Sequence, residues 1–253
     1  MSTDIAIEVR GFSQSFGDVR KIRGLDLDVH RNEILGIIGP ARSGKSTFLC
    51  ALNRLNDLVR GSRHDGTIRI DGKDIYAPDV DVIALRRKLG MVFATPVPLP
   101  RSICENVAFG ARRAGIRGRD RLDALVRDCL EKGGLWEEVK DRLDMSGLKL
   151  SGGQQQRLCL ARILAVQPEF ILLDEPTSGL DPISTMKIEE SLRRLKTDYT
   201  IVLVTNNTKQ AARVADRTAF FLNGELIEVG PTAKIFTAPD DKRTDDYLRG
   251  KFG

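Results

Sequence analysis

A glycine-rich segment, GPARSGKS at residues 39–46, has the residue types and spacing of a phosphate-binding loop. It fits the pattern G-x-x-x-x-G-K-[ST], in which glycines let backbone N–H groups approach phosphate oxygens closely. Lys45 adds a cation for the β- and γ-phosphates, and the Ser46 hydroxyl is suited to Mg²⁺. We predict that the loop and the residue after it bind the phosphates of a nucleotide: Gly39, Pro40, Ala41, Arg42, Ser43, Gly44, Lys45, Ser46 and Thr47.

Two adjacent carboxylates, Asp174 and Glu175, follow the apolar run FILL at residues 170–173. Such a run is typical of a buried strand, and side chains alternate along a strand, so we expect the two carboxylates to point to opposite sides. Asp174 would then hold Mg²⁺, while Glu175 would act as general base or orient the water that attacks the γ-phosphate. Taken alone, two adjacent carboxylates are more often the solvated end of a strand. Because the same chain also has a phosphate-binding loop, we favour the catalytic interpretation.

The segment LSGGQQQR at residues 150–157 opens a helix with one serine and two glycines. It lies shortly before the strand that carries the two carboxylates. An exposed helix N-terminus of this kind is suited to an anion. The residues alone leave two interpretations open, a second phosphate-binding element or an ordinary serine N-cap.

The segments around these motifs alternate between strands and helices. The apolar run at 34–39 predicts a buried strand before the phosphate loop, and helical spacing of apolar residues follows at 46–55. Half-buried strands are predicted at 5–9 and 24–29, where apolar and polar residues alternate. Further strands are predicted at 88–93, 170–174, 199–205 and 218–222, with helices at 183–196 and 209–215. This alternation predicts an α/β layered core.

Strand signals are missing between about residues 95 and 156. A proline cluster in this stretch, Pro96, Pro98 and Pro100, breaks regular structure, and helical patterns such as 119–132 follow. We therefore predict three parts: residues 1–94 with a β subdomain and the phosphate loop, an inserted helical subdomain at 95–156, and residues 157–253, which complete the core. The arginine-rich stretch 112–121 is expected to be a solvated loop or helix face.

The composition narrows the classes of function. With 253 residues, 41% of them hydrophobic and 30% charged, the chain has the composition of a globular protein. A net charge of only +5 and an aromatic content of 6% give no support to a nucleic-acid groove, so no nucleic-acid partner is expected. The four cysteines form no CxxC pair and there are only two histidines, which argues against a zinc site, a disulfide framework and a histidine-based triad.

In their order along the chain, GPARSGKST, LSGGQQQR, ILLDEP and SGLD resemble the ATP-binding subunit of an ABC transporter. The resemblance covers nearly the whole chain. It implies a P-loop NTPase (RecA-like) core with an antiparallel β subdomain and an inserted α-helical subdomain, and it implies ATP and Mg²⁺ as ligands. Segments such as LNRLNDLV, LWEEVKDRL and DDKRTDDYLRGKFG narrow the likeness to the phosphate-import ATPases. Nothing in composition or spacing points to phosphate as the transported solute.

In that family two subunits close head to tail around two ATP molecules, and the resemblance therefore assigns further residues to the nucleotide. The segment 151–154 of one chain would contact the nucleotide bound at Lys45 of the other, Asp181 would couple the two sites, and Phe16 would stack on adenine. The added set is Phe16, Ser151, Gly152, Gly153, Gln154 and Asp181. For Phe16, a core or edge-strand position is the alternative.

Two positions depart from the pattern of the family. The family's F-Q-x-P has a glutamine where this chain has Ala94, and its T-H-N has a γ-phosphate-binding histidine where this chain has Asn206. An asparagine amide donates a hydrogen bond, but it has neither the reach of the outer ring nitrogen nor a titrating proton. Asn206 is thus the predicted catalytic contact, and slow hydrolysis is expected. Arg42, in the phosphate loop, would either supply positive charge that compensates for these two departures or face solvent.

We expect the chain to be the ATP-hydrolysing motor of an ABC importer for inorganic phosphate. The first residues lack a secretory signal, and no uncharged apolar run approaches the ~18 residues that span a bilayer, so we expect a peripheral position on the cytoplasmic face of the membrane. The expected partners are a second ABC ATPase, identical or paralogous, two membrane permease subunits and, indirectly, an extracytoplasmic phosphate-binding protein.

The alternative is a regulatory subunit that binds ATP and closes with an intact paralogue but hydrolyses little. Ala94 and Asn206 favour this interpretation, whereas Glu175, Ser151 and Asp181 oppose it. An ABC ATPase of DNA repair is disfavoured because the chain has no room for a long coiled-coil insertion.

Overall fold

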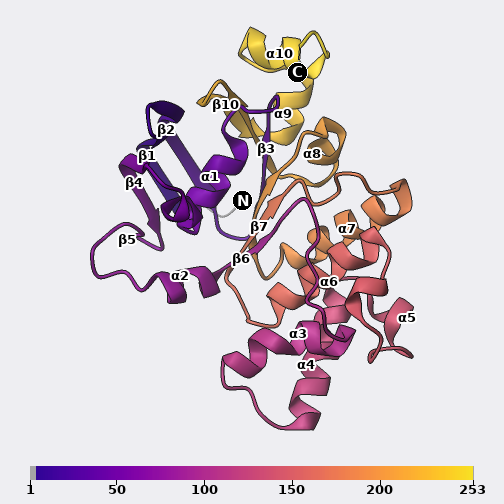
Figure 1. Cartoon of the computed structure of the whole chain (residues 1–253). Coiled ribbons are helices and arrows are strands. Elements are labelled where there is room, and N and C mark those ends of the chain that lie inside the picture. The colour runs from indigo at the N-terminus through magenta and orange to yellow at the C-terminus, as the bar shows by residue number, and fades with distance from the viewer. Residues whose placement is uncertain (1–3, 253) are drawn as a thin grey trace.

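The computed structural model describes residues 4–252 and contains two β-sheets with helices between and around them (Figure 1). This arrangement confirms the predicted α/β class and the separate antiparallel sheet. Within residues 4–252, no helix combines the length and the apolar character needed to cross a bilayer.

The larger sheet has six strands in the order β10-β9-β3-β8-β7-β6. The neighbours from β9 to β6 are parallel, and β10 pairs antiparallel with β9 at the edge. The inner strands are apolar and buried, as parallel strands covered on both faces must be. The bounds are β3 Ile34–Ile38, β6 Leu89–Val92, β7 Phe170–Asp174, β8 Thr200–Val204, β9 Arg217–Leu222 and β10 Glu225–Pro231.

The smaller sheet is antiparallel, with the order β2-β1-β4-β5. Its strands are β1 Ile5–Phe16, β2 Val19–His30, β4 Ser62–Ile70 and β5 Lys73–Asp74. β1 and β2 are therefore much longer than the strands predicted at 5–9 and 24–29. Beyond those segments they continue as a hairpin that closes at the pair Phe16 and Val19.

The helices complete the layers. Their bounds are α1 Lys45–Leu52, α2 Val82–Lys88, α3 Ile103–Arg113, α4 Arg119–Lys132, α5 Trp136–Val139, α6 Gly152–Leu164, α7 Pro182–Leu195, α8 Thr208–Val214, α9 Thr232–Thr237 and α10 Lys242–Leu248, with short 3₁₀ turns at Leu55–Leu58 and Gly147–Lys149. The helix predicted at 46–55 ends at Leu52, and α7 and α8 each lie one residue before their predicted positions.

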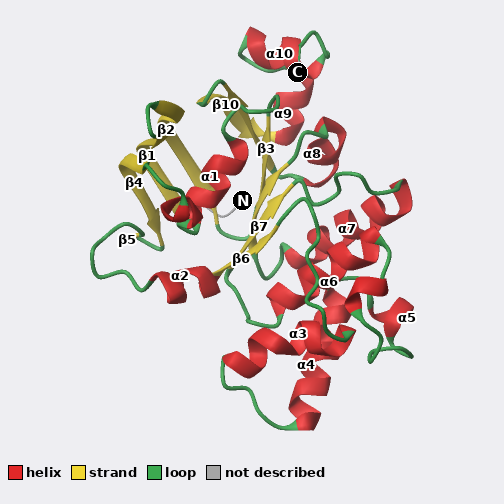
Figure 2. Ribbon diagram, in the orientation of Figure 1, coloured by secondary structure: helices red, strands yellow, loops and turns green. Residues whose placement is uncertain are grey.

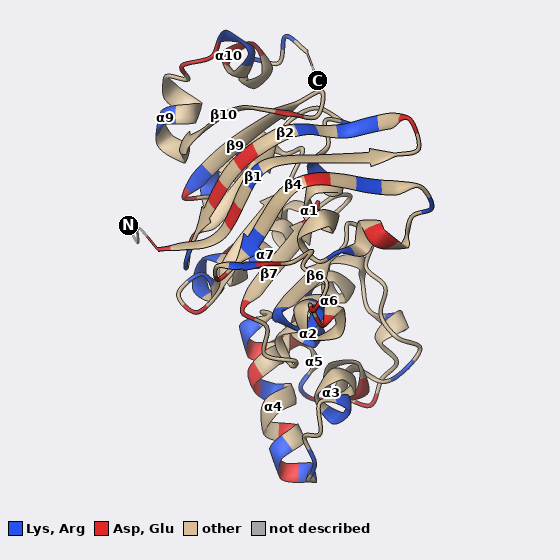
Figure 3. Ribbon diagram, turned by 90° about the vertical axis from the view of Figure 1, so that its left-hand side faces the viewer, with Lys and Arg blue, Asp and Glu red and all other residues tan. Residues whose placement is uncertain are grey.

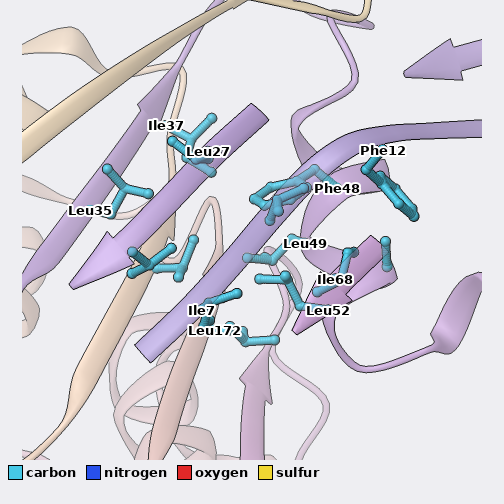
Figure 4. Packing of buried hydrophobic residues seen from close by; sticks show 14 of the residues in the cluster. Ile7, Phe12, Leu27, Leu35, Ile37, Phe48, Leu49, Leu52, Ile68 and Leu172 are labelled. Atoms are coloured by element: carbon cyan, nitrogen blue, oxygen red, sulfur yellow. The ribbon is translucent and has the colours of Figure 1, made fainter. Parts of the chain in front are cut away.

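Helix α1 lies between the two sheets and ties them together (Figure 4). Its buried side chains Phe48, Leu49 and Leu52 pack in one cluster with apolar residues of both sheets: Ile7, Phe12, Leu27 and Ile68 from the smaller, Leu35, Ile37 and Leu172 from the larger. Truncating a buried phenylalanine to alanine costs about 3–5 kcal/mol, so this packing fixes α1 firmly. The phosphate loop, which precedes α1, is fixed with it.

A second apolar cluster covers the opposite face of the larger sheet. It joins β7 and β8 to α3, α4, α6 and α7, the helices that gather on one side in Figure 2. Residues 95–156 hold α3, α4, α5 and the start of α6 and contribute no strand to either sheet, in agreement with the predicted helical segment. The limits of the three predicted parts remain a prediction.

Helix α4 has the bounds that its periodicity predicted, Arg119–Lys132. Acidic and basic residues are interspersed along it (Figure 3), and three (i, i+4) ion pairs connect them. The arginines of the stretch 112–121 are all exposed, as expected.

Candidate functional site

The phosphate loop connects the end of β3 with the start of α1, as predicted. Gly39 and Gly44 both have positive φ, 149° and 102°. A Cβ on Gly39 would lie 2.1 Å from the Phe221 carbonyl oxygen, and one on Gly44 would lie 2.9 Å from that of Lys21. Only glycine fits such close approaches of backbone to backbone, so the loop keeps its tight curvature.

Lys45 is held inside this loop. Its Nζ donates hydrogen bonds to the carbonyl oxygens of Gly39 at 2.7 Å and Pro40 at 2.9 Å. Burial lowers the pKa of Lys45, while the nearby Glu175 and Asp174 carboxylates act in the opposite direction. In the part of the chain that the structure describes, the buried hydroxyl of Ser43 has no hydrogen-bond partner. An orphaned donor and a buried cation in one loop fit an anionic ligand such as a phosphate chain.

The residues predicted to hold Mg²⁺ are brought together. The Ser46 hydroxyl donates to Asp174 Oδ1 at 2.9 Å, although the two residues come from α1 and β7. Burial raises the pKa of Asp174, and the Ser46 hydrogen bond partly offsets this. Within residues 4–252 no cluster of three or more His, Cys, Asp or Glu side chains could hold a metal. One carboxylate and one hydroxyl fit Mg²⁺, which usually keeps water and substrate oxygens as its other ligands.

The prediction that Asp174 and Glu175 point to opposite sides is wrong, because both side chains line the same cavity. β7 ends at Asp174, and Glu175 has a φ of +49°, in the left-handed region, so the strand alternation stops between them. Glu175 Oε2 accepts a hydrogen bond from the backbone N–H of Asn206 at 3.0 Å. Burial raises the pKa of Glu175, and this hydrogen bond acts against the rise.

A cavity of about 360 Å³ connects these groups. Its lining consists of Lys21, Ala41, Arg42, Ser43, Gly44, Lys45, Ser46, Thr47, Ala94, Asp174, Glu175 and Asn206. Both departures from the family pattern, Ala94 and Asn206, thus face the same space as the two carboxylates. Lys21 was missed by the sequence analysis because it lies on β2, far upstream of the loop and in no motif.

The remaining predicted residues lie outside this cavity. Phe16 is half-buried at the end of β1, opposite Val19 in the hairpin. The segment 151–154 and Asp181 start α6 and α7, respectively. Within one chain the structure therefore brings the phosphate loop and the two carboxylates together. The segment 151–154 and Asp181, the other predicted nucleotide contacts, lie outside that cavity.

The N-termini of α6 and α7 are capped and closely packed. Ser151 and Gln154 form a reciprocal capping box on α6, and Asp181 accepts from the backbone N–H of Ser184 at 2.9 Å and from its hydroxyl at 2.6 Å. The Ser184 hydrogen bonds lower the pKa of Asp181. A Cβ on Gly153 would lie 2.3 Å from the Ser184 hydroxyl oxygen, which shows how near the two helix ends are.

The chain is similar to one family model and to several solved structures. The family model described as ABC transporter matches residues 22–178. A structure of CbiO1 from Clostridium perfringens, described as part of the ABC transporter complex CbiONQ, is 25% identical with a TM-score of 0.82, and the match covers 96% of this chain and 95% of that one.

Two further solved structures are similar over most of this chain. The dimeric, post-hydrolysis ATP-binding cassette MJ0796 bound to ADP and Pi is 26% identical with a TM-score of 0.75, covering 89% of this chain and 98% of that one. A bacterial Atm1-family ABC exporter with ATP bound is 25% identical with a TM-score of 0.80. That match covers all of this chain and 43% of the exporter.

Proposed function

This chain belongs to the ABC transporter family, and we propose that it is the ATP-hydrolysing subunit of an importer for inorganic phosphate. One observation carries the ATPase part of the proposal: Lys45, Glu175 and the hydrogen-bonded pair of Ser46 and Asp174 line a single cavity. A cation for the phosphates, a Mg²⁺ site and a carboxylate for water are the parts that phosphoryl transfer to water requires.

The geometry supports a distinct role for each group. Lys45 exchanges its two carbonyl partners for oxygens of the β- and γ-phosphates. Ser46 and Asp174 would hold Mg²⁺, which would supply positive charge to the transferred phosphoryl group. Glu175, whose pKa is raised by burial, accepts a proton from the attacking water more readily than a solvated carboxylate would. The backbone N–H of Asn206 keeps that carboxylate turned toward the cavity.

We propose further that a second chain completes the site. The segment 151–154, in which Ser151 and Gly152 are exposed, lies at the start of the 13-residue helix α6, whose N–H groups and dipole favour an anion. Because this segment lies outside its own chain's cavity, it would face the nucleotide bound at Lys45 of the partner, with Asp181 beside it. Phe16 would stack on adenine. The similar cassette MJ0796 is described as a dimer, which supports this arrangement.

The importer assignment rests on the resemblance of several segments to phosphate-import ATPases. The likeness to CbiO1, described as part of an ABC transporter complex, supports the transporter assignment alone. The proposed assembly contains two ATPase chains on the cytoplasmic face of the membrane, two permease subunits and, indirectly, an extracytoplasmic phosphate-binding protein. With this assembly reconstituted, inorganic phosphate should stimulate ATP hydrolysis. Stimulation by another solute instead would overturn the phosphate assignment and leave the ATPase assignment standing.

A second candidate function is a regulatory subunit that binds ATP, pairs with an intact paralogue and hydrolyses little. The observation that favours it is the position of Ala94 and Asn206 in the cavity lining, where the family pattern has a glutamine and a histidine. The observation against it is that Glu175 and the hydrogen-bonded pair of Ser46 and Asp174 are all present and line the same cavity as Lys45.

Calorimetric titration of Lys45→Ala with Mg·ATP tests the binding site. Removing a buried cation that contacts phosphate should weaken ATP binding at least about tenfold, since a charge-assisted hydrogen bond contributes roughly 1.5–3 kcal/mol. Lys73→Ala, on the exposed edge strand β5, is the matched control and should bind normally. An unchanged affinity in Lys45→Ala would contradict the proposed nucleotide site.

A further inference from the structure

Glu138 on α5 connects three helices through a single carboxylate. Its Oε1 accepts hydrogen bonds from Arg157 at 2.7 Å and from Lys187 at 2.6 Å, and its Oε2 accepts from Arg157 at 3.1 Å and from the Gln154 amide at 2.8 Å. Gln154 and Arg157 belong to α6, and Lys187 belongs to α7. These hydrogen-bond donors lower the pKa of Glu138 to about 2, Arg157 most of all.

One of these contacts reaches the exposed N-terminus of α6 directly. The Gln154 side chain donates through Nε2 to Glu138, and its Oε1 accepts the backbone N–H of Ser151 at 3.1 Å. The amide therefore has both its ends fixed, and its orientation decides whether the capping box can form. A single side chain, that of Gln154, thus connects the Glu138 carboxylate to the backbone of Ser151.

The other contacts hold α6 against its neighbours. The Arg157 side chain is only 2% exposed, and it also donates to the Gly153 and Gly134 carbonyl oxygens at 3.3 and 2.6 Å. Lys187 extends the network to α7, whose N-terminus lies against Gly153. Two cations share one carboxylate, so Glu138 ties α6 and α7 to α5 at the end of α6 that carries the segment 151–154.

We propose that Glu138 is a positioning residue for the shared nucleotide site: it fixes the segment 151–154 in the orientation that receives the partner chain's ATP. This inference rests on the proposed function, because the segment acts on a nucleotide only if two chains close around it. Glu138 touches neither its own chain's cavity nor the phosphate loop. Loss of the Glu138 carboxylate should therefore weaken dimer closure and leave ATP binding at Lys45 of the same chain unchanged.

The first test uses Glu138→Gln in a chain that also carries Glu175→Gln, so that bound ATP is retained. The substituted amide keeps the shape of the side chain but places an N–H₂ group against Gln154, Arg157 or Lys187, all of which are donors. The ATP concentration for half-maximal dimerisation, measured by sedimentation, should rise on the order of tenfold, the effect of one lost charge-assisted hydrogen bond. Affinity of the separate chain for ATP should stay the same.

Glu137→Gln is the matched control because, among the residues that the structure describes, the Glu137 carboxylate forms an ion pair only with the exposed Lys140. This substitution should not affect dimerisation. If Glu138→Gln dimerises at the same ATP concentration as the parent, the inference alone is overturned. If the parent binds ATP but remains monomeric at all concentrations, the shared site of the proposed function fails, and this inference fails with it. Should Glu138→Gln fold too poorly to bind ATP, Glu138→Asp keeps the charge with a shorter reach and is expected to show the same loss.

A mixing experiment separates positioning across the dimer from a general structural role. The dimer to be measured contains one Lys45→Ala chain and one Glu138→Gln chain. If Glu138 acts on the nucleotide bound by the partner, both substitutions affect the same composite site, and the second composite site stays intact. Such dimers, again with Glu175→Gln, should retain as much ATP after rapid desalting as dimers of Lys45→Ala with the parent. Retention of no ATP, while the parental mixture retains it, would place the defect in the chain's own site and overturn the proposal.

Discussion

At the scale of single residues, the cavity lining contains two non-glycine residues with left-handed backbone, Arg42 and Glu175, with φ of 65° and 49°. A left-handed conformation costs an L-residue roughly 1–2 kcal/mol relative to its favoured state. Strain of this kind is tolerated where the side chain has a function. Glu175 has an assigned role, and Arg42 is the unexplained case.

Arg42→Gly is expected to raise stability and weaken ATP binding at the same time. Glycine adopts positive φ freely, and after its greater entropy in the unfolded chain is subtracted, a gain of about 0.5–1 kcal/mol in the free energy of unfolding remains. Loss of a cation beside the phosphates should weaken ATP binding severalfold. Urea titration and calorimetry measure the two effects separately.

Gln167→Gly is the control for this prediction, because Gln167 also has positive φ, 53°, but lies away from the cavity. It should show a similar gain in stability with unchanged ATP affinity. If Arg42→Gly binds ATP as well as the parent does, Arg42 faces solvent and contributes nothing to the site.

At the scale of elements, the sequence predicts best where burial is complete. The bounds of β7 and α4 match their predictions, because an unbroken apolar run and a regular 3.6-residue pattern each leave one interpretation. β4 was missed because its sequence SRHDGTIRI buries only Ile68 and Ile70. β10 was missed as well, and none of its residues is fully buried. Such strands are specified by pairing with a neighbour, which no local pattern records.

The contact between the ends of α6 and α7 predicts opposite outcomes for two adjacent glycines. In Gly153→Ala the new Cβ would lie 2.3 Å from the Ser184 hydroxyl oxygen and 2.6 Å from its Cβ, so the helix ends must move apart. Overpacking of this kind costs about 1–3 kcal/mol. In Gly152→Ala the nearest atom is 3.6 Å away, and the better helix propensity of alanine should make the change neutral or stabilising.

Thermal unfolding of both variants measures the difference in stability, and sedimentation with ATP measures its consequence for closure. Gly153→Ala should also require more ATP to dimerise, since the displaced segment is the one proposed to meet the partner's nucleotide. Equal stability of the two variants would show that Ser184 yields easily and that the spacing of the helix ends is not restrictive.

At the scale of the whole molecule, the motifs predicted that the phosphate loop and the two carboxylates line one cavity, because each motif has its own chemistry and flanking elements, but no motif pointed to Lys21. The orientation of Glu175 was not predictable, since a single residue with positive φ reverses the direction expected from strand alternation. The contacts of Glu138 could not be predicted either. In the charged stretch LWEEVKDRL it has the signature of a solvated helix face, and only the fold brings Arg157 and Lys187 to it.

Whether the assembled molecule is a motor or a regulator depends on the two departures in the cavity. Restoring the family residues, Ala94→Gln together with Asn206→His, should raise kcat far more than it changes ATP affinity. Both positions line the same cavity as Glu175 and the pair of Ser46 and Asp174, the groups proposed to act on the attacking water and the transferred phosphoryl group. Binding of ATP in the ground state rests mainly on Lys45 and the loop. One transition-state contact typically contributes about 10²–10³ in rate.

The measurement is steady-state phosphate release by the parent, both single variants and the double variant, each with the membrane partners present. Residues that act as a unit are not additive, so the double variant should exceed the product of the single gains. If the parent already turns over as fast as the double variant, then the backbone N–H of Asn206, which holds Glu175 whatever side chain follows it, is sufficient for positioning the base. Ala94 and Asn206 would then be tolerated substitutions in a working motor, and the regulatory candidate would lose the observation that supports it.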